Sequence, residues 1–242
     1  MCAQLLHLPQ VSKTDRCRIC PTRTVCLASF VPDEAVDELP GLFQCSEALE
    51  AGEHLYHAED EAVCQYHVRS GMVKTYLINA EGDEYVTGFY LPGEIVGHHY
   101  VEQRHVESAV ALQTTTVCEI DEVATQAAGH KGLTAPLLRH MAANASLESR
   151  NQINLKQSSA QARFAGFCAL LAVRLERLGR DPRYLPTPMS RTDLASYLGM
   201  TLESLSRVVS KLNAAQVIRA GREQIEVLQR ETLDTLSLHV RI

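Results

Sequence analysis

Three cysteines near the start of the chain have a spacing that suits metal or redox chemistry. Cys17, Cys20 and Cys26 follow the pattern Cys-x2-Cys-x5-Cys, and thiolates this close in sequence can converge on one inorganic core. A 4Fe-4S cluster takes four thiolates, and a tetrahedral zinc ion can use the same kind of ligand. A redox dithiol at Cys17 and Cys20 also fits. The spacing alone leaves these three chemistries open.

A 4Fe-4S cluster would need a fourth ligand from elsewhere in the chain. The other cysteines are Cys2, Cys45, Cys64, Cys118 and Cys168. Disulfides are not expected among them in a reducing compartment. For Cys45, Cys64 and Cys168 we favour packing as small buried hydrophobes, and Cys2 belongs to the chain terminus, where order is usually poor.

The bulk composition is that of an ordinary globular protein with room for two domains. The chain has 242 residues, 45% hydrophobic and 21% charged, which excludes wholesale disorder and a fibrous repeat. No apolar run approaches the roughly 18 to 20 residues of a membrane span, and no basic-then-apolar leader opens the sequence. We therefore expect a cytoplasmic protein with no membrane partner.

Charge is unevenly distributed along the chain, although the net charge is -6. Residues 27–149 carry five basic and twenty acidic side chains, whereas residues 150–222 carry twelve basic and four acidic ones. This surplus predicts contact with nucleic-acid phosphates in the C-terminal half. No nucleophile elbow, phosphate loop or paired-carboxylate pattern indicates an enzyme, so a non-enzymatic protein is expected.

The elements that must position these groups follow from the hydrophobic pattern. From about residue 43 to 120, short β-rich runs alternate with turns, which is typical of a small β-barrel or roll. Apolar spacings of three and four residues predict a long helix over 133–157 and an amphipathic helix over 160–178. The proline-containing stretch 182–188 is interpreted as a hinge.

Residues 190–212 have the pattern of a helix-turn-helix. Ser190 and Thr201 can cap two helices, and Gly199 can supply the positive φ of the turn between them. The apolar side chains of the second helix should face inward: Leu202, Leu205, Val208, Val209 and Leu212. Its outward face would carry side chains suited to reading base edges: Glu203, Ser204, Ser206, Arg207, Ser210 and Lys211. An ordinary helical hairpin is the alternative, which the basic surplus disfavours.

A strand, a turn and a second strand are predicted over 217–227. They would form a wing that brings Arg219 and Arg222 towards phosphate. A winged helix-turn-helix therefore accounts for this half of the chain better than a plain helical hairpin.

With these parts in this order, the chain resembles the CRP/FNR superfamily, and specifically its FNR branch of oxygen-responsive regulators. The likeness covers roughly residues 17–230 and is carried by the cysteine run and by the segments Gly82–Phe89, Thr116–Ile120 and Glu203–Arg207. It implies an α+β fold with an N-terminal β-roll like a cyclic-nucleotide-binding jelly roll, a long dimerisation helix and a C-terminal winged helix-turn-helix. The expected limits are 1–30 for the cluster-binding segment, 31–130 for the β-roll, 131–158 for the dimerisation helix and 159–242 for the winged helix-turn-helix domain.

The resemblance also implies site residues and a mechanism. Cys118 would complete the 4Fe-4S ligand set, and Glu203, Ser206 and Arg207 would read palindromic half-sites of TTGAT type, with Ser204, Lys211 and Arg222 as further DNA contacts. A homodimer with an intact cluster would bind double-stranded DNA and recruit RNA polymerase, and oxygen would dismantle the cluster. A zinc-stabilised or thiol-redox regulator with no cluster stays open. A ferredoxin-like electron carrier is disfavoured, because it needs no helix-turn-helix.

The chain departs from the cyclic-nucleotide branch of this superfamily at the nucleotide-holding positions. Gly97, His98 and His99 replace a Gly-Glu-Leu stretch, and Glu107 with Ser108 replaces an Arg-Ser pair. A carboxylate at this position would repel a phosphate. No cyclic nucleotide is therefore expected as a ligand.

The long helix is expected to carry the dimer interface through Met141, Glu148 and Leu155. Two parallel seams are compatible with its spacing, one through Leu137 and one through Leu138, and both place Glu148 opposite its symmetry mate. Two carboxylates that face each other repel, and a polar residue in such a seam lowers stability. The resemblance places Glu148 where the family carries an acidic residue, and we expect a marginal dimer.

Overall fold

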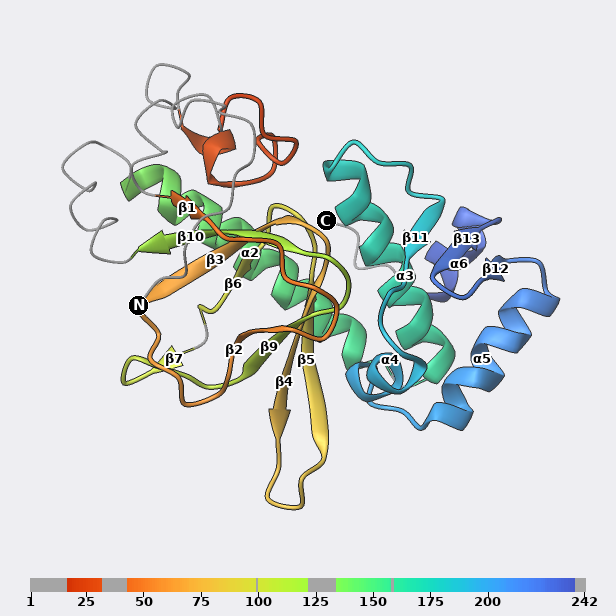
Figure 1. Ribbon diagram of the computed structural model, residues 1–242. Coiled ribbons are helices and arrows are strands. Elements are labelled where there is room, and N and C mark those ends of the chain that lie inside the picture. The colour runs from red at the N-terminus through yellow and green to blue at the C-terminus, as the bar shows by residue number, and fades with distance from the viewer. Residues whose placement is uncertain (1–16, 32–42, 99, 122–133, 158, 238–242) are drawn as a thin grey trace. The chain divides into compact units, whose positions relative to one another are not determined.

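The computed structural model describes residues 17–31, 43–98, 100–121, 134–157 and 159–237 (Figure 1). Two compact units share the chain. The first comprises residues 1–73 and 89–143, and the second comprises residues 74–88 and 144–242. Cys2 lies outside the described residues. No helix in the described ranges is both long and apolar enough to cross a membrane.

Short strands build the predicted β-roll. They are β1 (Phe43–Cys45), β2 (His54–Tyr56), β3 (Cys64–Ser70), β4 (Val73–Ile78), β5 (Glu84–Tyr90), β6 (Ile95–Val96), β7 (Tyr100–Val101), β8 (Arg104–His105), β9 (Ser108–Ala111) and β10 (Thr116–Asp121). One sheet has the order β1-β10-β3-β6, a second has the order β2-β9-β4-β5, and β7 pairs with β8. Antiparallel register places Cys118 of β10 opposite His67 of β3 and opposite Cys45 of β1.

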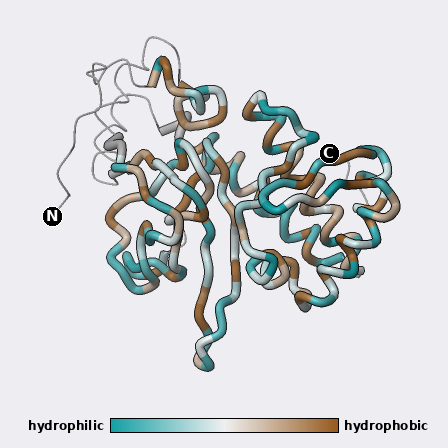
Figure 2. Tube along the Cα trace, turned by 45° about the vertical axis from the view of Figure 1, so that its right-hand side comes forward, coloured by the Kyte–Doolittle hydropathy of each residue, from teal (hydrophilic) through white to brown (hydrophobic). Residues whose placement is uncertain are grey.

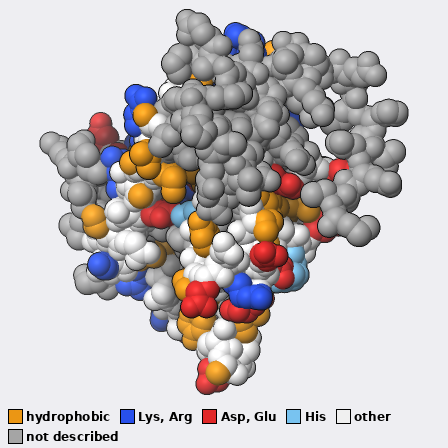
Figure 3. All heavy atoms as spheres, turned by 90° about the vertical axis from the view of Figure 1, so that its left-hand side faces the viewer, with side chains coloured by type: hydrophobic (Ala, Val, Ile, Leu, Met, Phe, Trp, Pro, Cys, Tyr) orange, Lys and Arg blue, Asp and Glu red, His pale blue; other side chains and the backbone are white. Residues whose placement is uncertain are grey.

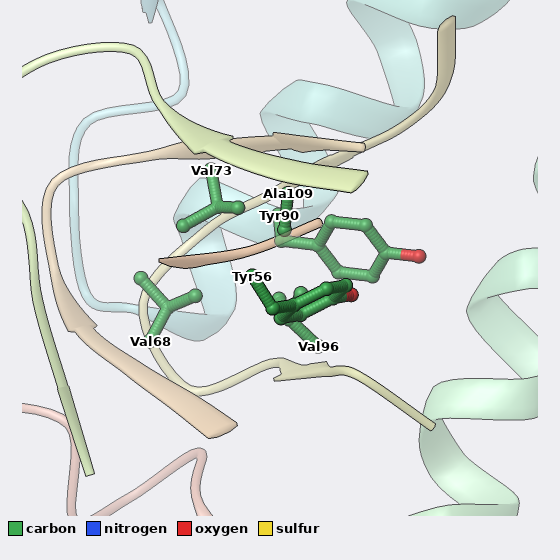
Figure 4. Packing of buried hydrophobic residues seen from close by; sticks show 6 residues of the cluster. All are labelled: Tyr56, Val68, Val73, Tyr90, Val96 and Ala109. Atoms are coloured by element: carbon green, nitrogen blue, oxygen red, sulfur yellow. The ribbon is translucent and has the colours of Figure 1, made fainter. Parts of the chain in front are cut away.

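The interior of the roll holds buried apolar residues of these strands. Side chains from several strands meet in one cluster (Figure 4): Tyr56, Val68, Val73, Tyr90, Val96 and Ala109. Val68, Val73, Val96 and Ala109 are fully buried. Burial of each larger apolar side chain stabilises the fold by on the order of 1.5 to 3 kcal/mol, so this cluster contributes to the stability of the first unit.

Five α-helices and a short 3-10 helix complete the described chain. They are η1 (Leu27–Phe30), α2 (Thr134–Leu155), α3 (Ala160–Arg177), α4 (Arg191–Tyr197), α5 (Leu202–Ala214) and α6 (Arg230–Leu236). The two long helices agree with the predicted ranges. Pro136 is tolerated in α2 because it lies in the first turn, where backbone N–H groups have no helical partner.

Helix caps agree with the sequence-based prediction. The Ser190 hydroxyl accepts a hydrogen bond from the Asp193 N–H, and the Asp193 side chain accepts one from the Ser190 N–H, so both halves of a capping box are present. The Thr201 side chain accepts from the Ser204 N–H at the start of α5. Gly199 has φ +59° in the turn between α4 and α5.

Two expectations for the C-terminal half are wrong. The stretch interpreted as a hinge contains β11 (Tyr184–Pro186), which pairs with β13 (Gln224–Val227), and β13 pairs with β12 (Ile218–Ala220). Proline is acceptable there because β11 is an edge strand. Leu202 is 46% exposed rather than inward-facing, because it is the first residue of α5 and the buried face begins at Leu205.

The β4–β5 hairpin belongs to the second unit through residues 74–88. Lys74 Nζ lies 3.2 Å from a Glu84 carboxylate oxygen and 2.8 Å from an Asp193 one. The Ser196 hydroxyl accepts from the Val86 N–H at 3.1 Å and donates to the Glu84 carbonyl at 3.2 Å. These bonds attach the hairpin to α4.

The strand ends next to the turn of this hairpin carry exposed apolar side chains. Figure 2 shows hydrophobic residues along this hairpin, and Figure 3 shows hydrophobic and acidic side chains together at the lower end of the view. The exposed apolar side chains are Leu77, Ile78 and Tyr85.

Candidate cysteine centre and DNA-binding surface

The cysteine run folds as a series of tight turns. The Cys20 N–H donates to the Cys17 carbonyl at 3.4 Å, and the Cys26 N–H donates to the Thr22 carbonyl at 2.9 Å. Helix η1 begins directly after Cys26. These turns bring residues that are nine positions apart in sequence to one side of the segment.

One cavity in the first unit is bordered by all four predicted cluster ligands. Cys17, Cys20, Cys26 and Cys118 line it together with Thr22, Leu27, Ala28, His67, Val68 and Arg69. None of these four cysteines forms a disulfide. Among the described residues, no three His, Cys, Asp or Glu side chains are arranged to hold a metal ion. The four thiols nevertheless line one shared space.

Burial controls the electrostatics of this cavity. Burial raises the pKa of the Cys26 thiol, and the neighbouring Cys20 raises it further. The Cys20 sulfur lies 3.1 Å from the Thr22 hydroxyl oxygen. A thiolate at Cys26 would therefore need compensating positive charge, which a bound metal centre would supply.

The remaining cysteines fall outside the cavity or outside the description. Cys168 is fully buried in α3, and burial raises its pKa to about 12, as expected for a cysteine that packs as a hydrophobe. Cys64 lies opposite Asp121 in the β3–β10 register and is half-buried. Cys45 is the register partner of Cys118, and its side chain lies outside the described atoms.

Sequence reasoning missed three polar cavity-lining residues: Thr22, His67 and Arg69. No pattern in the sequence marks them, because only the register of β3 against β10 brings His67 beside Cys118. Arg69 supplies a positive charge in the wall of the cavity.

The turn at Gly93 seats the cysteine segment, and its substitution should loosen that segment. Gly93 has φ +91°, and a Cβ there would lie 2.4 Å from Val25 Cγ2. Gly52 has φ +89° with nothing within 4 Å of its added Cβ. Gly93→Ala should therefore speed alkylation of Cys26 in the cluster-free protein. Gly52→Ala is the control, because it suffers the same backbone strain of about 1 to 3 kcal/mol without the clash, and it should leave the alkylation rate unchanged. Equal alkylation rates in both variants would contradict the docking of Val25 on Gly93.

Helix α5 presents the predicted base-reading side chains on its exposed face. Glu203, Ser206, Arg207 and Lys211 are exposed. Arg207 lies 3.4 Å from Glu203 one turn away. Ser204 is half-buried and engaged with the Thr201 cap, and the Ser206 hydroxyl donates to the Leu202 carbonyl at 2.9 Å. The charged side chains Glu203, Arg207 and Lys211 thus remain on the exposed face of α5, whereas the Ser204 and Ser206 side chains are engaged within the helix.

The predicted wing is present, with its two arginines in different settings. Arg222 is exposed in the turn between β12 and β13. Arg219 forms an ion pair with Glu226 of the neighbouring strand. Part of its charge is thus already compensated, so Arg222 is the better candidate for phosphate contact.

The long helix leaves two apolar side chains of its candidate dimer seams exposed. Leu138 is 61% exposed and Met141 is 38% exposed. Glu148 and Leu155 are half-buried. The side chain of Leu137 lies outside the described atoms, and the exposed side chains are compatible with both seams.

Two family models match the chain. A Crp-like helix-turn-helix domain matches residues 167–236, and a cyclic nucleotide-binding domain matches residues 46–128. The fumarate and nitrate reduction regulatory proteins of Yersinia pestis and Escherichia coli strain K12 are each 29% identical to this chain. The first covers 91% of this chain and 90% of its own length, and the second covers 93% and 91%.

Among solved structures, FixK2 from Bradyrhizobium japonicum is similar, with a TM-score of 0.71 and 26% identity over 82% of this chain and 99% of its own. The β-roll, the long helix and the winged helix-turn-helix together define a DNA-binding transcription regulator. The chain is similar to the CRP/FNR family over both matched regions. This confirms the predicted fold class and the expectation that the protein is not an enzyme, and the family implies dimerisation.

Proposed function

We propose that this protein is an oxygen-responsive regulator that binds palindromic TTGAT-type DNA as a homodimer while a 4Fe-4S cluster is held by Cys17, Cys20, Cys26 and Cys118. One observation carries the proposal: these four thiols, from segments far apart in sequence, border one cavity. Relatives named as fumarate and nitrate reduction regulators support it. By the same resemblance, RNA polymerase is the expected protein partner.

The residues present fit such a cluster by the chemistry of the donor set. Four cysteines match the ligand number of a 4Fe-4S core, and apolar neighbours such as Leu27 and Val68 limit access of water. When bound, the cluster would supply an oxygen-labile link between the cysteine segment and β10. Arg69 in the cavity wall would offset negative charge there.

The test is anaerobic purification of the full chain, followed by iron, sulfide and zinc analysis and by DNA titration before and after exposure to air. The proposal expects about four iron and four sulfide per protomer and DNA binding that falls when air removes them. Stoichiometric zinc without sulfide would instead support the zinc-stabilised regulator. DNA binding indifferent to iron content would refute the oxygen response.

The packing inside the β-roll supports a function that does not use a cyclic nucleotide as ligand. The rings of Tyr56 and His105 stack with centroids 3.7 Å apart, and Glu107 is only 4% exposed. The added Cβ of a residue at Gly97 would contact both rings within 3.4 Å. Packed rings and a buried acidic residue thus stand where the family resemblance places ribose and phosphate contacts.

Two arginines should separate base reading from phosphate contact. Arg207→Ala should relax preference at one half-site position by about 1 to 3 kcal/mol, because one arginine can pair with both guanine acceptors. Arg222→Ala should weaken binding to all sequences alike and reduce the salt dependence, because a phosphate contact carries no sequence information. Titrations over a set of operator variants at two salt concentrations measure both. An unchanged preference in Arg207→Ala would exclude it as the reading residue.

A further inference from the structure

A stack of two histidines connects the cysteine cavity to α2. His67 lines the cavity and lies opposite Cys118 in the sheet register. Its ring stacks on that of His140, with centroids 4.7 Å apart and planes inclined by 16°. The two residues are 4% and 2% exposed. Strand β3, which pairs with the strand that carries Cys118, therefore contacts α2 through two buried and stacked rings.

A second connection reaches the same histidine from the cysteine run. Helix η1 starts directly after Cys26, and the Ser29 hydroxyl donates to the Cys26 carbonyl at 2.8 Å. Phe30, the last residue of η1, places its ring 5.4 Å from that of His140 at an angle of 57°. A displacement of Cys26 is thus passed along one helical turn to Phe30. Both connections end on His140.

The position of His140 in α2 suits a coupling role. The next residue, Met141, is 38% exposed and belongs to both candidate dimer seams. His140 is buried against His67 and Phe30 within the first unit, whereas Met141 is exposed. Because close-packed interiors transmit displacements rather than absorb them, a shift of the His140 ring relocates the seam residue beside it.

We infer that His140 is a positioning residue that couples the state of the four-cysteine site to the dimer seam of α2, through its ring contacts with His67 and Phe30. This inference rests on the proposed function. Interfaces with two discrete packings convert small local shifts into changes of assembly. His140 would accordingly contribute nothing to holding the cluster and would decide how strongly cluster loading favours the dimer.

The test compares dimerisation of the full-length protein with and without a reconstituted cluster. His140→Leu fills the volume but removes the flat ring, and His140→Phe keeps a ring that can stack. His105→Leu is the matched control, because His105 is 1% exposed and stacked on Tyr56 in the same unit, yet does not line the cavity. Iron and sulfide content is measured first, and sedimentation then gives the dimer dissociation constant of each form.

We expect His140→Leu to load iron and sulfide as wild type does. The ratio of its dimer dissociation constants without and with the cluster should fall by about fivefold or more, which is the lower end of measured couplings between sites. His140→Phe and His105→Leu should keep the wild-type ratio. Phe30→Leu should reduce the ratio as well, which provides a second variant if His140→Leu folds poorly.

Two results would overturn the inference. Wild-type coupling in both His140→Leu and Phe30→Leu would show that neither ring contact matters. Loss of iron loading in His140→Leu would make the residue part of the binding site rather than of the link. Failure of the proposed function itself is seen separately, as a wild-type dimer that does not respond to loading.

Discussion

Cys118→Ser should abolish cluster binding in anaerobically reconstituted protein. Serine keeps the size of the side chain but removes the soft thiolate, and Cys118 is the one predicted ligand supplied by the sheet. Loss of a residue that only hydrogen-bonds to a metal ligand typically costs about 10- to 100-fold in metal affinity. Loss of a direct ligand should therefore reduce bound iron by about tenfold or more. Visible absorbance and iron analysis measure the effect.

Cys64→Ser is the matched control for that experiment. Cys64 lies on the neighbouring strand of the same sheet, is half-buried like Cys118 and does not line the cavity. It should load iron as wild type does. Loss of absorbance in Cys64→Ser with retention in Cys118→Ser would reassign the fourth ligand.

Glu148→Ala should strengthen the dimer of the cluster-free protein in air. Both candidate seams place this carboxylate against its symmetry mate, and the Coulomb repulsion of two such charges about 4 Å apart is on the order of 1 to 4 kcal/mol between bulk water and a protein surface. Removal of the repulsion should tighten the dimer by about fivefold or more. Sedimentation equilibrium measures the constant, and DNA titration in air should follow it.

Two further variants identify the cause of that effect. Glu148→Gln removes the charge and retains the polar side chain, so it should act in the same direction. Ser149→Ala changes an exposed neighbour that belongs to neither seam and should leave the dimer unchanged. A Glu148→Ala protein that sediments as wild type would place this carboxylate outside the interface.

The parts of the fold with strong local signals could be predicted from sequence. The caps at Ser190 and Thr201 and the turn at Gly199 are set by local hydrogen bonds and backbone freedom. The strand within 182–188 cannot be predicted locally, because it exists only by pairing with β13, about forty residues further along the chain. Long-range pairing of this kind leaves no local periodicity.

The candidate site was predictable to the same extent. The run Cys17 to Cys26 is marked by its spacing. The ligand role of Cys118 is predicted only by the family resemblance, because no local pattern connects it with that run. His67, Arg69 and His140 carry no sequence signal, since their proximity depends on strand register and on helix packing. The ligand roles of the cysteines and the reading role of Arg207 stay predictions.

The attachment of the β4–β5 hairpin to α4 affects how this chain can be divided for experiments. A fragment that starts at the long helix would carry the DNA-binding helices without residues 74–88. Asp193 would then lose the ammonium group of Lys74, and the Ser196 hydroxyl would lose both of its hairpin partners. Lys74, with only 10% of its side chain exposed, would be left behind on the other fragment as a newly uncovered cation. The cut that looks natural along the sequence therefore passes through a cooperative unit of the folded protein.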